Sequence, residues 1–145
     1  MIKRIETELT DAIRAHDELR RDTLRLILAA LRSAEKKLLR PLSGDEELQV
    51  LQRERKRRIE AAEAFRAGDR PEKAVREEAE LKILEEFMPA PLSQEELEEI
   101  VDNAVAAVGA TNVRDLGRVM ADVMPQVSGR ADGSVVSQLV REALA

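Results

Sequence analysis

The chain has 145 residues, a length that suits one ordinary domain or two small helical ones. It contains no cysteine, which excludes disulfides, thiolate metal sites and cysteine nucleophiles. The formal net charge is −5, and residues 93–145 carry four basic and nine acidic side chains, so any contact with nucleic acid must use local basic patches.

Four helices are predicted in the first part of the chain, because apolar residues recur there at helical spacing. The first covers about residues 2–13. Asp17 offers an N-cap for the second, and Pro41 disfavours helix at the residue before it. The apolar stripe of this second helix consists of Leu24, Ile27, Leu28, Leu31 and Leu38.

The third and fourth helices have clear end signals. Ser43 and Glu46 have the spacing of a capping box, in which each side chain satisfies a free backbone N–H group. The third helix is expected to end near residue 67, where Gly68 can take the left-handed conformation. Pro71 suits the first turn of a fourth helix that ends near Met88.

Three more helices are predicted after a proline-rich break. Ser93 and Glu96 form a second capping box, which opens a helix closed by Gly109. Asn112 is expected to cap the next helix, which Pro125 and Gly129 end, and Asp132 begins the last one.

The predicted organisation is all-α, with about four helices followed by a small three-helix tail module. The expected N-terminal helical domain covers residues 1–88, the linker residues 89–92 and the tail domain residues 93–145. The N-terminus lacks the apolar core of a signal peptide, and no uncharged apolar run approaches the roughly 20 residues that span a bilayer. We therefore expect a cytoplasmic protein without a membrane partner.

Residues for catalysis are not found in the sequence. Neither phosphate-cradling glycine motif is present, and the single histidine, His16, is interpreted as a surface residue near a helix end. The glutamates at positions 77, 78, 80, 85 and 86 lie among Lys73, Arg76 and Lys82 at i,i+4-type spacing and are interpreted as a solvated helix face. No catalytic residue, metal site or cofactor is predicted.

Two basic features precede the tail. Arg21, Arg25, Arg32 and Lys36 recur close to helical spacing and form a secondary basic patch that could follow a phosphate backbone. Residues 53–58 contain five cations, but successive helical residues step by 100°, so these cations point all round the helix. Solvated faces with long stems over the core are the other interpretation of both features.

The tail contains an unusual glycine pattern. Gly117 lies inside a predicted helix, where it costs about 0.8–1 kcal/mol relative to alanine, so close packing or the close approach of a partner is expected there. Arg130 precedes the helix that Asp132 caps, and a helix N-terminus favours an anion. An ordinary capped glycine turn explains this second feature equally well.

These residues resemble a known family along the whole chain. Residues 116–120 (LGRVM) and 129–136 (GRADGSVV) look like the closing signature of the GatB/YqeY family. Earlier landmarks of that family resemble residues 23–31 (TLRLILAAL), 80–89 (ELKILEEFMP) and 92–97 (LSQEEL).

The resemblance implies an all-helical protein similar to the C-terminal region of the B subunit of glutamyl/aspartyl-tRNA amidotransferase, whose tail contacts tRNA. It implies a stand-alone adaptor linked to aminoacyl-tRNA metabolism, with tRNA and an amidotransferase, synthetase or other translation protein as candidate partners. A protein-interaction module without RNA affinity is the alternative. A carbon–nitrogen ligase with glutamine as amide donor is the third hypothesis, although the catalytic portion has no counterpart in the sequence. The RNA-contact candidates that the resemblance implies are Arg118 and Arg130, with Gly117, Gly129 and Gly133 allowing close approach and Arg114 and Arg141 as additions.

Overall fold

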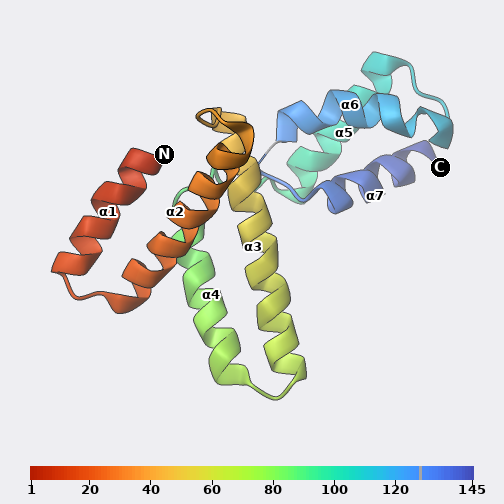
Figure 1. The fold of residues 1–145 in the computed structure, drawn as a ribbon. Helices are drawn as coiled ribbons and strands as arrows, with labels where there is room; N and C mark the ends of the chain where they lie inside the picture. Colours follow the sequence, from red (N-terminus) through yellow and green to blue (C-terminus); the bar gives the residue numbers. More distant parts are fainter. Residues whose placement is uncertain (128) are drawn as a thin grey trace. The chain divides into compact units, whose positions relative to one another are not determined.

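The computed structural model describes residues 1–127 and 129–145 of the chain. These residues form an all-α fold, as predicted, and Figure 1 shows the order of its helices. The elements are α1 (Ile2–Arg14), α2 (Glu18–Leu38), α3 (Gly44–Ala67), α4 (Pro71–Glu85), α5 (Gln94–Val108), the 3₁₀ helix η1 (Val113–Asp115), α6 (Leu116–Val127) and α7 (Gly133–Leu144). The chain divides into two compact units, residues 1–89 and 90–145.

The N-terminal unit consists of two helical hairpins. Helix α1 packs on α2, α3 packs on α4, and α2 also contacts both α3 and α4 (Figure 1). The predicted stripe of α2 is buried at Leu24, Ile27, Leu28 and Leu31, but Leu38 is 45% exposed. The prediction for Leu38 is therefore wrong, because its side chain lines an open groove between α2 and α3.

The two capping boxes form as predicted, but the end of α3 differs from the prediction. Both capping boxes form, with the Ser43 and Ser93 side chains accepting from the backbone N–H groups of Glu46 and Glu96. Gly68 has φ −86°, so it does not take the left-handed conformation that the sequence predicts. Asp69 does so instead, with φ 57°, and aspartate is one of the residues that tolerate this region.

The C-terminal unit is a small bundle of α5, α6 and α7. Its core contains mostly valines, which lie on one face of each helix. Pro125 lies inside α6 and does not end it, contrary to the prediction. Pro125 has no backbone N–H group, so α6 lacks one hydrogen bond. The missing bond lies in the last turn of α6, where Pro125 is exposed.

Among the described residues, no helix combines the length and the hydropathy that a membrane span requires.

Candidate nucleic-acid interface

The turn from α5 to α6 is fixed by short polar contacts. The Asn112 side chain accepts a hydrogen bond from the Arg114 N–H (2.9 Å), and Asp115 accepts one from the Thr111 N–H (2.9 Å). The bond from Thr111 lowers the pKa of Asp115, and the nearby Arg118 lowers it further, so this carboxylate is ionised at neutral pH. The turn leaves the side chain of Arg114 exposed.

Arg118 contacts both ends of this turn. Its guanidinium donates to Asp115 Oδ1 (3.1 Å) and to the carbonyl oxygen of Val108, the last residue of α5. A cation at this place satisfies a carbonyl left free at the helix end and interacts favourably with the helix dipole. The Arg118 side chain is still 61% exposed, so it retains N–H groups for a ligand.

Arg141 joins this group from the other end of the sequence. It lies in the last turn of α7 and is exposed, and α7 contacts η1. Arg114, Arg118 and Arg141 therefore gather at one end of the C-terminal unit, together with the exposed Gly117. We call these four residues the arginine end.

The remaining predicted residues lie at the opposite end of α6, whose 12 residues span about 18 Å. Arg130 Nε donates to the Ala90 carbonyl oxygen (3.2 Å), and the Arg130 carbonyl oxygen accepts from the Leu92 N–H (3.0 Å). Gly129 has φ +72°, a conformation that favours glycine, and Gly133 is the first residue of α7. The structure thus separates the predicted RNA contacts into two groups.

The secondary basic patch on α2 is partly neutralised. Arg21 forms an ion pair with Asp22 (2.9 Å), and Arg32 forms one with Glu6. Arg25 and Lys36 are exposed and have no ion pair within the described part of the chain.

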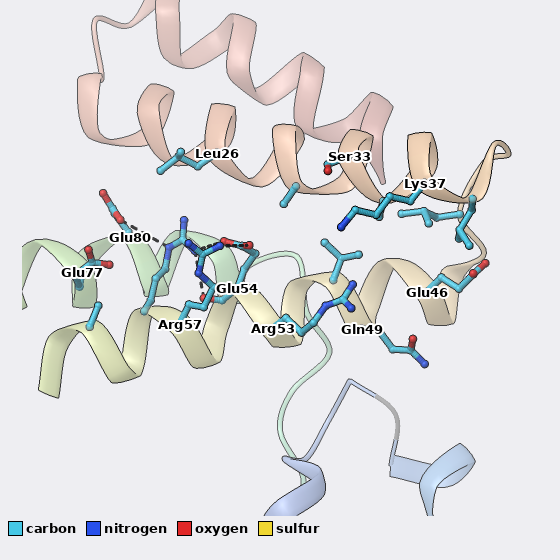
Figure 2. Close-up of a pocket in the computed structure, with 17 residues that line it drawn as sticks. Leu26, Ser33, Lys37, Glu46, Gln49, Arg53, Glu54, Arg57, Glu77 and Glu80 are labelled. Atoms are coloured by element: carbon cyan, nitrogen blue, oxygen red, sulfur yellow. Dashed lines mark hydrogen bonds and ion pairs between the residues drawn. The ribbon is translucent and has the colours of Figure 1, made fainter. Parts of the chain in front are cut away.

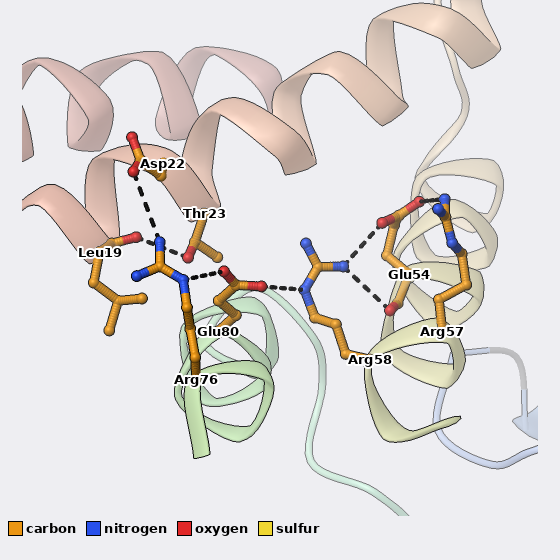
Figure 3. Close-up of polar contacts among 8 residues, drawn as sticks. All are labelled: Leu19, Asp22, Thr23, Glu54, Arg57, Arg58, Arg76 and Glu80. Carbon is orange, nitrogen blue, oxygen red and sulfur yellow. Dashed lines mark hydrogen bonds and ion pairs between the residues drawn. The ribbon is translucent and has the colours of Figure 1, made fainter. Parts of the chain in front are cut away.

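A buried polar network in the N-terminal unit was missed by the sequence analysis (Figure 3). Arg58 and Glu80 are only 6% and 7% exposed. Arg58 Nη1 donates to Glu54 Oε2 (2.9 Å), and Arg58 Nε lies 3.7 Å from Glu80 Oε2, too far for a hydrogen bond. Arg76 Nε lies 3.4 Å from the other Glu80 oxygen and links it toward Asp22 on α2.

The prediction that Glu80 belongs to a solvated face is wrong, because this face of α4 packs on α3 and α2. Burial raises the pKa of Glu80, and the charge of Glu77 raises it further, although Arg58 and Arg76 oppose the change. Two signals in the sequence point to the network: Glu54 precedes Arg58 by four residues, and Arg76 precedes Glu80 by four. The network joins α3, α4 and α2, which is a structural role.

Among the described residues, no group of three or more acidic or histidine side chains is placed to hold a metal ion.

Comparison with known proteins identifies relatives of the whole chain. The family described as "Yqey-like protein" matches residues 2–144, which include both units. Among curated proteins, "Altered inheritance of mitochondria protein 41, mitochondrial" from Pyrenophora tritici-repentis (strain Pt-1C-BFP) is 28% identical over 147 residues, which cover 98% of this chain and 80% of the relative.

Proposed function

We propose that this chain, which belongs to the YqeY-like protein family, is an adaptor. It contacts tRNA through the arginine end of its C-terminal unit. The adaptor would then act in aminoacyl-tRNA metabolism. The resemblance of the tail to that of the tRNA-dependent amidotransferase supports this proposal.

The observation that carries the proposal is the surroundings of Gly117. A Cβ atom at this position would meet no atom within 4 Å, so packing inside the unit does not account for a glycine in α6. Gly117 is the second residue of α6, directly after η1, and glycine in a helix costs up to about 1 kcal/mol of stability relative to alanine. A ligand backbone that approaches closely between Arg114 and Arg118 would explain why the chain bears this cost.

Charge limits how such a contact can work. The C-terminal unit is acidic, so it does not attract phosphate at long range. Contacts must be local, and the arginine end offers three guanidinium groups. Three phosphate contacts predict a slope of log K against log salt of only about −2 to −3.

The test is a filter-binding titration with bulk tRNA at two salt concentrations. Arg118→Ala and Arg141→Ala are each expected to weaken binding and to reduce the slope by about 0.7–0.9. Gly117→Ala is expected to weaken binding while it stabilises the fold, because its methyl group occupies the surface that the ligand approaches.

Gly44→Ala is the matched control for Gly117→Ala, because a Cβ atom at Gly44 also meets nothing within 4 Å and this residue begins α3 in the other unit. It is expected to leave tRNA binding unchanged. Binding that is independent of salt, or that Gly117→Ala and Arg118→Ala do not affect, would refute the proposal.

A further inference from the structure

A groove of about 890 Å³ lies between α2 and α3 in the N-terminal unit, with α4 closing one end (Figure 2). On α2 its lining runs from Leu26 to Leu38. The twelve helical steps from Leu26 to Leu38 correspond to about 18 Å, so the groove is long enough for about three turns of a helical segment laid along it.

One wall of the groove carries an apolar stripe that is only partly covered. Leu26, Ala30, Ala34 and Leu38 follow one another at intervals of four residues and line it together. Leu26 and Leu38 are 52% and 45% exposed. Helix α2 therefore carries a second apolar stripe that the core covers in part, at Ala30 and Ala34, and that stays exposed at Leu26 and Leu38. This pattern is typical of a helix that receives a partner.

Two cations extend into the groove from opposite walls. Figure 2 shows Lys37 of α2 and Arg53 of α3 pointing toward one another across it. Both side chains are exposed, and neither forms an ion pair with any residue that the structure describes.

The acids that line the groove are mostly engaged elsewhere. Glu46 binds Arg40, Glu54 binds Arg58, and Glu80 lies between Arg58 and Arg76. Glu77 lies near Glu80, at the α4 end of the groove. Acidic groups of an occupant are therefore favoured over Lys37 and Arg53 and disfavoured at the α4 end.

We propose that this groove binds an acidic amphipathic helix of a partner protein, whose apolar side chains cover the Leu26–Leu38 stripe and whose carboxylates pair with Lys37 and Arg53. Apolar side chains at i, i+4 and i+7 form one face of such a helix, as in other complexes where a helix docks in a groove. A nucleic-acid backbone satisfies the two cations but leaves the leucines uncovered. The proposal goes beyond the tRNA contact of the other unit and uses none of its residues.

The experiment uses the full chain and a fluorescein-labelled helical peptide of about 16 residues, with leucines at i, i+4, i+7 and i+11 and glutamates on both flanks. Fluorescence anisotropy is expected to show saturable binding that the double variant Lys37→Glu/Arg53→Glu weakens at least about tenfold. A peptide with lysines in place of the glutamates is expected to prefer that variant, because the charges are then exchanged on both sides.

The double variant Lys36→Glu/Lys56→Glu is the matched control. It makes the same change of net charge on the same two helices, at exposed residues that do not line the groove. It is expected to weaken binding of the acidic peptide much less than Lys37→Glu/Arg53→Glu does, because its side chains do not line the groove and salt screens exposed charges.

Three results would overturn the proposal: no binding at about 1 mM peptide, equal weakening by both double variants, and no weakening by either. Bulk tRNA could displace the peptide, and Lys37→Glu/Arg53→Glu could lose tRNA binding. These two results together would also overturn the proposal, because they would show that the groove binds nucleic acid. If that variant does not fold, as judged by circular dichroism, Leu26→Ser replaces it, and unchanged peptide binding by Leu26→Ser refutes the proposal.

Discussion

The replacement of Arg58 by alanine is expected to destabilise the N-terminal unit by about 3–5 kcal/mol, the usual effect of removing one partner of a buried ion pair. The side chains of Arg58, Glu80 and Glu54 are only 6%, 10% and 15% exposed, so both carboxylates would remain largely buried without it. Their remaining partners are Arg76 and Arg57, which are 57% and 77% exposed and compensate little.

Urea unfolding followed by far-UV circular dichroism measures this effect, because the chain has no tryptophan or tyrosine to report by fluorescence. An ordinary domain is stable by about 5–15 kcal/mol, so the expected loss is about a fifth or more of its stability. Arg57→Ala is the matched control one residue away, and we expect it to change the free energy of unfolding by less than about 0.5 kcal/mol. Equal effects of Arg58→Ala and Arg57→Ala would refute the reasoning.

The same network predicts a pH dependence. Folding raises the pKa of Glu80 above its ordinary value of 4.5, so the folded chain holds this proton more tightly than the unfolded chain does. The ionisation of Glu80 therefore reduces stability as the pH rises from 4.5 through the folded pKa. Glu80→Gln is expected to remove this decrease, and an unchanged pH profile of the variant would contradict the assignment.

Three further predictions concern helix ends and glycines. Arg40, with Ser43 of the capping box, lowers the pKa of Glu46 to about 2. The contribution of Glu46 to stability is therefore present above pH 4.5 and lost as the pH falls toward 2. Arg40→Ala should raise the pKa of Glu46 in an NMR titration, and an unchanged pKa contradicts the pairing. Gly129→Ala should destabilise the C-terminal unit by about 1–2 kcal/mol, because Gly129 has a positive φ. Gly117→Ala should stabilise this unit by about 0.5–1 kcal/mol, because a methyl group there meets no other atom. Thermal unfolding measures both effects, and the opposite order of stability would refute this account of the two glycines. Ser93→Ala should cost about 1 kcal/mol in the same assay, and no loss would show that the capping box contributes nothing.

The sequence predicts those features of the fold that depend on neighbouring residues. Both capping boxes and the buried stripe of α2 were predictable, because the residues that form them are three or four positions apart. The 3₁₀ helix before α6 was not, since Asn112 caps either kind of helix with the same hydrogen bond. The second apolar stripe of α2 could not be predicted for a related reason. Helical spacing alone does not say that Leu26 and Leu38 face a groove while Leu24 faces the core.

A cation is available to a ligand only if no acid or carbonyl group of its own fold binds it. Such partners are often distant in the sequence, so charge patterns alone predict binding sites poorly. Arg32 pairs with Glu6 across 26 positions, and Arg130 binds the Ala90 carbonyl across 40. Of the five cations in residues 53–58, Arg55 pairs with Glu85 and two others pair with Glu54. What remains of this run is Lys56, which faces outward, and Arg53, which lies in the groove. A cation counts toward a binding surface only after the acids of its own fold have been assigned. By that criterion Lys37 and Arg53 in the groove, and Arg114 and Arg141 at the arginine end, have charge to offer a partner, whereas Arg118 already pairs with Asp115.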